Sequence, residues 1–152
     1  MAIHPNIRPY VSKDKPALLG IFKLNVPVSF AESEIRDFDQ YLYHGLEKYF
    51  IAELNGEIIG AGGINFEDSG RTGVISWDFI HPNQQGRGIG SRLLKHRLRI
   101  LESMAGVEKV IVRTSQFAYP FYKKHGFATE KVEEDYWAPG FNLYKMRYVP
   151  GK

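Results

Sequence analysis

The chain has 152 residues, a length that suits one domain with a hydrophobic core and leaves little room for a second. Its residues are 43% hydrophobic and include no cysteine, which excludes disulfides, thiolate metal ligands and a cysteine nucleophile. The formal net charge of +3 suits an anionic ligand but is too small to indicate nucleic-acid binding by itself.

The sequence shows no targeting or membrane-spanning pattern. No stretch approaches the roughly 20 apolar residues that span a bilayer. The start, Met1 to Pro5, lacks the basic segment and apolar run of a signal peptide. We therefore expect a cytoplasmic protein that binds neither membrane nor nucleic acid. The 5 histidines show no His-Glu-x-x-His spacing, and we expect no metal site.

The first quarter of the chain predicts one strand and two helices. Residues 7–10 have the pattern of a short strand. Asp14 is expected to cap a helix over residues 14–23, which has a proline in its first turn. Apolar residues at spacings of three and four predict a second helix over residues 31–43.

Three strand patterns follow. Residues 49–54 and 58–64 flank Asn55-Gly56, the dipeptide that favours a two-residue hairpin turn. Residues 72–80 form the third pattern and end at a His-Pro pair. We therefore expect a hairpin followed by another strand.

The second half predicts helices alternating with strands, and then a closing strand pair. A long helix over residues 88–105 precedes a strand over 107–113 and a short helix over 118–125. The last strands cover residues 127–134 and 141–148. The resulting order, β-α-α-β-β-β-α-β-α-β-β, mixes hairpins with crossover helices, and this indicates a single α/β domain with a mixed sheet.

The predicted helix over residues 88–105 is also the most basic part of the chain. Its basic residues are Arg92, Lys95, His96, Arg97 and Arg99. Leucines recur among them at helical spacing, as in an amphipathic helix. We therefore expect these charges to form the solvated outer face of the helix rather than a nucleic-acid site.

A glycine-rich loop opens this helix and suits an anion. The first backbone N–H groups of a helix lack partners within the helix, and the helix dipole favours negative charge there. Gly86, Gly88 and Gly90 would let the backbone approach a bulky pyrophosphate. Arg87 could add a charge-assisted hydrogen bond. The alternative is a tight turn that serves only the path of the chain.

Three phosphate-binding patterns compete for this loop. A P-loop needs a lysine directly after its glycines, and none is present. A dinucleotide fingerprint, Gly-x-Gly-x-x-Gly, fails because Ser91 and Leu93 occupy the place of its third glycine. The pattern Gln/Arg-x-x-Gly-x-Gly/Ala is matched by Gln85, Gly88 and Gly90.

With this third pattern, residues 79–90 (FIHPNQQGRGIG) resemble the acetyl-CoA signature of the GCN5-related N-acetyltransferase (GNAT) superfamily. Residues 118–127 (AYPFYKKHGF) are similar to its second motif, Ala-x-x-Phe-Tyr-x-x-x-Gly-Phe. The element order agrees along essentially the whole chain. The resemblance implies a GNAT domain over residues 5–150, with a twisted mixed sheet of about six or seven strands and about four helices. It implies acetyl-CoA as co-substrate, without a metal.

The resemblance also implies which residues hold acetyl-CoA. Backbone groups at the end of the strand before the loop would contact the pantetheine arm, and the Ile80 N–H would point at the acetyl carbonyl as an oxyanion donor. Ser115 stands where the family often has an asparagine. The implied cofactor-binding residues are Phe79, Ile80, Gln85, Gly86, Arg87, Gly88, Ile89, Gly90, Ser91, Ser115 and Tyr122.

Direct transfer of acetyl to an amine needs a proton donor and a proton acceptor. Tyr122 matches the family tyrosine that protonates the departing thiolate, although a tyrosine there could also serve packing alone. Asp78, near the end of the strand, is the first candidate for taking the proton of the amine. Glu67, Asp68 and a chain of water molecules are alternatives.

The resemblance places the acceptor between the first two helices and the turn joining the last two strands. Residues 27–34 and 136–141 supply aromatic side chains and the carboxylates of Glu32 and Glu34. Aromatic walls with carboxylates suit a cationic amine, but the same aromatic residues could simply close the core. A small amine, an amino acid, a peptide N-terminus and a protein lysine stay open, as does a homodimer. The rival function is a non-catalytic acyl-CoA sensor or partner-binding module.

Overall fold

A seven-stranded mixed sheet forms the centre of the computed structural model, which describes residues 4–150. Its strand order is β1-β2-β3-β4-β5-β7-β6, and only the pair β4–β5 is parallel. The strands are β1 (Asn6–Pro9), β2 (Lys48–Leu54), β3 (Glu57–Glu67), β4 (Thr72–Ile80), β5 (Lys109–Thr114), β6 (Phe127–Ala138) and β7 (Phe141–Tyr148).

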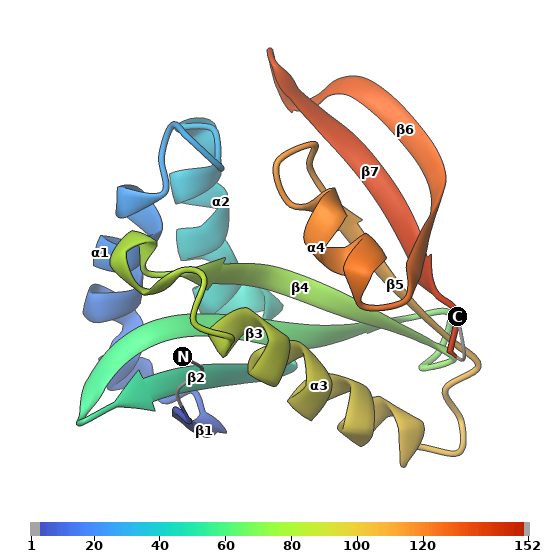
Figure 1. Cartoon of the computed structure of the whole chain (residues 1–152), viewed down its shortest axis with the longest axis horizontal. Helices are drawn as coiled ribbons and strands as arrows, with labels where there is room; N and C mark the ends of the chain where they lie inside the picture. The colour runs from blue at the N-terminus through green and yellow to red at the C-terminus, as the bar shows by residue number, and fades with distance from the viewer. Residues whose placement is uncertain (1–3, 151–152) are drawn as a thin grey trace.

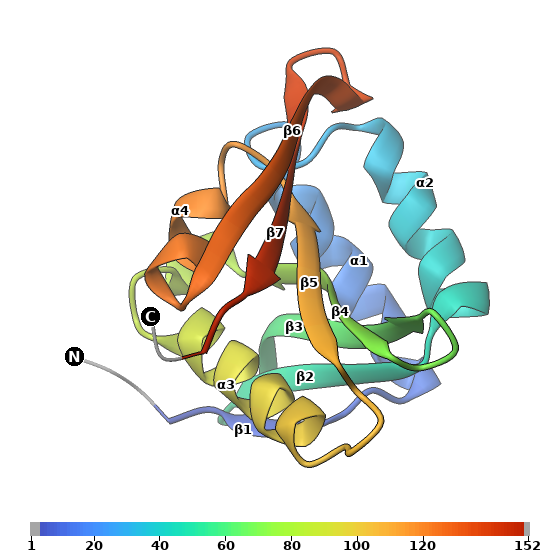
Figure 2. The same cartoon turned by 90° about the vertical axis from the view of Figure 1, so that its right-hand side faces the viewer.

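Helices cover both faces of this sheet (Figure 1). They are α1 (Lys15–Leu24), α2 (Ser33–Gln40), α3 (Ile89–Glu102) and α4 (Tyr119–Lys124). Figure 2 shows α1 and α2 on one face of the strands β1 to β4 and α3 on the other. The α4 helix packs against β6. The predicted α/β class and order of elements are confirmed.

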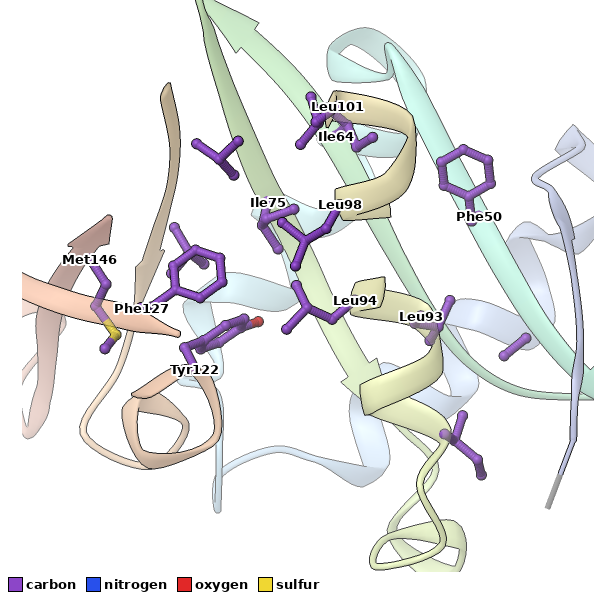
Figure 3. Close-up of a cluster of buried hydrophobic side chains, with 14 of the residues drawn as sticks. Phe50, Ile64, Ile75, Leu93, Leu94, Leu98, Leu101, Tyr122, Phe127 and Met146 are labelled. Carbon is purple, nitrogen blue, oxygen red and sulfur yellow. The ribbon is translucent and has the colours of Figure 1, made fainter. Parts of the chain in front are cut away.

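Two hydrophobic clusters fill the space between the helices and the sheet. On the side of α1 and α2, Phe22 and Phe38 are fully buried and stack with ring centroids 4.8 Å apart. On the other side, leucines of α3 pack on β3 and β4, and Tyr122 and Phe127 extend this cluster toward β7 (Figure 3).

The predicted hairpin at Asn55-Gly56 is confirmed. Asn55 and Gly56 have φ angles of 53° and 81°, which suit the two-residue turn that this dipeptide favours. The predicted helix over residues 31–43 is shorter than expected, because α2 gives way at Tyr41 to a π-helical turn over Tyr41–Gly45.

The N-terminal end of α1 is set by an ion pair. Asp14 was expected to cap the helix, and it is the N-cap residue of α1 at the end of a 3₁₀ turn over Ser12–Asp14, but its side chain makes no capping hydrogen bond to α1. Its carboxylate accepts hydrogen bonds from the Val11 N–H at 2.9 Å and from the Arg8 guanidinium at 2.8 and 2.9 Å. The hydrogen bonds from Arg8 are the main reason why the pKa of Asp14 is lowered.

One expectation about α3 is wrong. Arg97 was assigned to the solvated face of the helix, but its side chain is fully buried. The position lies four residues after Leu93 and four before Leu101, so Arg97 belongs to the face that packs on the sheet. A guanidinium can occupy such a place because Asp78 and two backbone carbonyls accept its hydrogen bonds.

The strands β4 and β5 separate at one end of the sheet. Their parallel pairing covers only four residue pairs, from Thr72 with Lys109 to Ile75 with Val112. Residues 76–80 of β4 then continue without a partner in β5. Figure 2 shows β5, β7 and β6 rising away from the first half of the sheet beyond this point.

A bulge reshapes β4 beside this opening. Ala61 pairs with Phe79 and Gly63 pairs with Ser76, so Gly62 faces two residues, Trp77 and Asp78. Trp77 takes a φ of 50°, which is rare for a residue with a bulky side chain. An extra residue of this kind bends the strand and redirects the side chains next to it.

Candidate active site

A cavity of about 970 Å³ lies where β4 and β5 separate. The end of β4, the glycine loop with the start of α3, and α4 line one part of it. Residues from the segment before α2 and from the turn between β6 and β7 line another part. Its volume falls in the usual range for a small-molecule site.

The glycine loop has the backbone conformation that its sequence predicts for an anion site. Gly86 and Gly88 have φ angles of 79° and 84°, which residues with a Cβ atom rarely adopt. Gly88 is the N-cap residue of α3, so the N–H groups of the first turn face the loop and the cavity. Arg87 is exposed and donates a hydrogen bond to the Gln84 side chain at 2.7 Å.

The Ile80 N–H points toward the opening beside β4. The neighbouring His81 N–H donates to Ile59 on β3 at 2.8 Å. Successive N–H groups of a strand point to opposite sides, so the Ile80 N–H is directed away from β3. On this side of β4 the Ile80 carbonyl accepts a hydrogen bond from the Asn25 side chain at 3.2 Å. The position is compatible with the predicted oxyanion donor.

Asp78, Arg97 and Tyr122 form one buried hydrogen-bonded network. Arg97 binds both carboxylate oxygens of Asp78, and its Nη2 lies 2.8 Å from Oδ2. The Tyr122 hydroxyl donates to the same Oδ2 at 2.6 Å. The Asp78 side chain keeps 20% of its surface exposed and lines the cavity. The candidate acid and the candidate base of the sequence analysis are therefore in direct contact.

The environment of Tyr122 favours its neutral form. The side chain is 3% exposed and packs beside Phe127, with its hydroxyl turned the other way (Figure 3). Burial and the Asp78 carboxylate raise the pKa of Tyr122 well above its ordinary value. Burial alone would lower the pKa of Arg97, but Asp78 outweighs this effect and raises it.

Three further hydrogen bonds hold the α4 side of the cavity. The Nδ1 of His125 lies 2.8 Å from the Phe121 carbonyl, which can only accept, so Nδ1 carries the hydrogen. In the neutral ring, Nε2 then accepts from the Ser91 hydroxyl at 3.0 Å. The Ser115 hydroxyl oxygen accepts from the Phe117 N–H at 3.3 Å, which fixes its side chain at the start of α4.

The two alternative carboxylates lie elsewhere. Glu67 ends β3 and Asp68 begins the turn that leads into β4, whereas the cavity lies at the other end of β4. Glu67 is paired with Arg113 at 2.7 and 3.0 Å, and Asp68 accepts from the Thr72 hydroxyl at 2.9 Å. Neither side chain lines the cavity.

The side of the cavity next to α2 is aromatic and holds one carboxylate. Phe30 and Trp77 stack with centroids 6.5 Å apart and an interplanar angle of 21°. Glu34 is 6% exposed, and its Oε2 accepts the Ala31 N–H at 2.8 Å. Burial raises the pKa of Glu34, and this effect exceeds the opposite effect of the Ala31 hydrogen bond. All three side chains line the cavity.

The turn between β6 and β7 is fastened next to this region. The Gln116 side chain donates to the Gly140 carbonyl at 2.7 Å and accepts from the Asn142 N–H at 2.8 Å. The Trp137 indole N–H donates to the Thr114 carbonyl at 3.2 Å. Trp137 and Phe141 line the cavity, so they contribute to its wall as well as to packing.

The sequence matches the Acetyltransferase (GNAT) family over residues 15–127, and the chain belongs to this family. It is therefore an enzyme of the N-acetyltransferase class, and the family uses acetyl-CoA.

Individual relatives are more distant. An IAA acetyltransferase from Azospirillum brasilense is 29% identical over 84 residues, which cover 53% of this chain and 54% of that protein. The chain thus spans about half the length of this curated relative. The structure of the ribosomal-protein-S18-alanine N-acetyltransferase from Escherichia coli is similar, with a TM-score of 0.77 and 17% identity over 95% of this chain and 93% of that chain.

The structure of a third relative contains a bisubstrate analogue. Naa50 from Arabidopsis thaliana, in complex with the bisubstrate analogue CoA-Ac-MVNAL, has a TM-score of 0.74 and 18% identity over 97% of this chain and 99% of that chain. At such identities the likeness concerns the fold. Between residues 4 and 150, no helix has the length and apolar character needed to cross a bilayer. The same residues contain no group of three or more side chains placed to bind a metal ion.

Proposed function

We propose that the chain transfers an acetyl group from coenzyme A to a primary amine by direct attack while both substrates are bound. The observation that carries this proposal is the cavity at the parted strands, which joins the glycine loop to the Asp78–Tyr122 pair. The acetyltransferase domain would span residues 5–150. A cytoplasmic location and a homodimer stay predictions.

The residues around the loop fit coenzyme A by shape and charge. Positive φ angles at Gly86 and Gly88 and the open first turn of α3 suit a pyrophosphate. The opening between β4 and β5 suits an extended pantetheine arm, with Phe79, Ile80 and Ser115 beside it. When bound, the co-substrate supplies a reactive acetyl thioester. The Ile80 N–H would polarise its carbonyl.

The Asp78–Tyr122 contact supports a proton relay. The amine must lose a proton and the sulfur must gain one. An ionised Tyr122 beside an ionised Asp78 is unfavourable, so a proton that leaves Tyr122 should be replaced as it leaves. We assign this replacement to Asp78: its Oδ2 accepts the proton of the amine as the Tyr122 hydrogen turns to the sulfur, and then returns a proton to the Tyr122 oxygen. Arg97 would hold Asp78 in place throughout.

The first experiment combines binding and turnover. Calorimetry with acetyl-CoA should give micromolar affinity, and a free-thiol assay should show release with at least one amine of a panel. The Tyr122→Phe variant should keep the affinity and lose turnover by about 100-fold or more. No binding of acetyl-CoA would overturn the proposal.

The rival function, an acyl-CoA sensor, needs the loop but neither Tyr122 nor an open acceptor side. The extension of the cavity to the α2 side favours the enzyme. Tight binding without thiol release on any amine, peptide or protein would instead favour the sensor.

A further inference from the structure

Glu34 is the unusual group in the part of the cavity that coenzyme A would not occupy. The co-substrate would lie along the loop, the end of β4 and α4, as proposed above. The lining residues on the α2 side and at the turn between β6 and β7 are Asn25, Ser29, Phe30, Glu34, Trp77, Trp137 and Phe141. Among these seven, Glu34 is the only one that can carry a charge.

The carboxylate of Glu34 is only half satisfied by the protein. One oxygen, Oε2, accepts the Ala31 N–H. Among residues 4–150, no group donates a hydrogen bond to Oε1. In the same range, every side-chain oxygen that is inaccessible to solvent has a hydrogen-bond partner, so Oε1 must be accessible. Oε1 therefore opens into the cavity that the residue lines.

Among residues 4–150, the Glu34 carboxylate forms no ion pair. The other acidic side chain of the cavity, Asp78, is neutralised by Arg97. A buried carboxylate without a counter-charge is unfavourable, and a ligand with a positive charge would relieve this cost.

The walls next to Glu34 fit the same ligand. Phe30 and Trp77 present stacked rings beside it, and Trp77 is placed there by the bulge in β4. Aromatic faces attract cations and bind the apolar parts of an amine. The Ala31 contact alone would explain a helix-capping glutamate, but not the aromatic walls of the cavity that its second oxygen faces.

We propose that Glu34 binds a cationic group of the acceptor, so that the preferred substrate is a compact amine with a second positive charge, distinct from the nitrogen that is acetylated. Asp78 and Tyr122 lie on the α3 and α4 side of β4, whereas Glu34 and Trp77 lie on the α2 side. The reacting nitrogen and the recognised cation thus belong at opposite ends of the acceptor. The inference rests on the proposed function for the site.

The test compares two aromatic amines that differ in one charge. Benzylamine has one aminomethyl group and 1,4-bis(aminomethyl)benzene has two, so the second offers a free cation when the first nitrogen reacts. Calorimetry on the protein saturated with coenzyme A should show the diamine binding at least about 10-fold more tightly. The thiol assay should show the same preference in kcat/KM.

Glu34→Gln removes the charge and keeps an oxygen for the Ala31 N–H, so α2 should stay folded. This variant should lose the preference for the diamine, so that the two amines bind and react alike. Glu32→Gln is the matched control, since it removes the same charge from an exposed position two residues earlier. The control should keep the preference.

The possible outcomes distinguish a failure of the Glu34 cation site from a failure of the proposed acetyltransferase function. Equal binding of the two amines to the wild type, or an unchanged preference in Glu34→Gln, would overturn the inference even if both amines are acetylated. Preferential binding that depends on Glu34, without thiol release, would support the cation site and count against the transferase. Loss of folding in Glu34→Gln, seen by circular dichroism, would assign the residue to capping and overturn the inference.

Discussion

Gly62 and Arg97 are packed so closely that a Cβ atom at residue 62 would lie 2.7 Å from the guanidinium carbon of Arg97 and 2.6 Å from Asp78 Oδ1. Glycine at this position thus makes room for the ion pair beneath the bulge of β4. The pair, in turn, is what Tyr122 binds.

Gly62→Ala should destabilise the protein and disable the site together. Neither the buried guanidinium nor the carboxylate can move away freely, and such overpacking costs about 1–3 kcal/mol of unfolding free energy. Urea unfolding measures the loss, and the thiol assay should show slower turnover. Gly20→Ala is the control, because Gly20 is exposed on α1 with no atom within 4 Å of an added Cβ. It should leave stability equal or slightly higher. Equal effects of the two substitutions would contradict the packing argument.

Removing Arg97 alone should lower the unfolding free energy more than removing both Arg97 and Asp78. Arg97→Met leaves the partly buried Asp78 without its partner, and breaking a fully buried pair in this way costs about 3–5 kcal/mol of unfolding free energy, which is the upper bound here. The double variant Arg97→Met with Asp78→Leu removes both charges and should recover part of this stability. Chemical denaturation of the two variants and both single changes gives the coupling between the residues. A coupling energy near zero would show that the two charges do not stabilise each other.

The glycine loop should tolerate a methyl group at one position and not at another. Gly88→Ala forces a residue with a Cβ atom into a φ of 84°, and should weaken acetyl-CoA binding about 10-fold or more. Gly90→Ala should bind nearly normally, because its Cβ would meet Phe121 at an ordinary 3.4 Å. Calorimetry distinguishes them. Similar affinities for both variants would mean that the backbone geometry of the loop is not needed for binding.

Tyr122 should stay protonated across the whole working range of pH. Its pKa is raised above the ordinary value of about 10, so its acid form persists at lower pH. We therefore expect kcat not to fall as the pH is raised to about 10. Over the same range, deprotonation of the amine should raise kcat/KM. The same shift means that Tyr122 stabilises the fold fully below about pH 10, and that this contribution is lost as the pH rises toward its folded pKa. A fall in kcat with an apparent pKa near 8, absent from Tyr122→Phe, would refute the assignment.

Local patterns predicted much of this structure, because they depend on neighbours in the chain. The turn at Asn55-Gly56, the glycine loop before α3 and the order of elements all follow from residues a few positions apart. Asp78 and Tyr122 were singled out separately, but their contact joins residues 44 positions apart and only the fold brings them together.

The burial of Arg97 was missed for a physical reason. A charged residue in an amphipathic helix is assigned to solvent unless a partner is known, and Asp78 lies 19 positions away on a strand. The helical spacing from Leu93 was the available signal, since it puts Arg97 on the apolar face. The free oxygen of Glu34 had no sequence signal, because a glutamate near a helix start usually serves as a cap.

The parted strands also have a consequence for how firmly the free protein holds together. Four residue pairs join β4 to β5, and residues 76–80 of β4 have no partner in β5, so the sheet is open at the place where the co-substrate would lie. A molecule that bridges this seam would act as a clamp between the two halves and add about 2.7 kcal/mol of unfolding free energy at 100 times its Kd. The melting temperature should then rise with acetyl-CoA concentration, and amide hydrogen exchange over residues 76–80 should slow most. We therefore expect the two halves of the sheet to be held together most firmly when acetyl-CoA is bound.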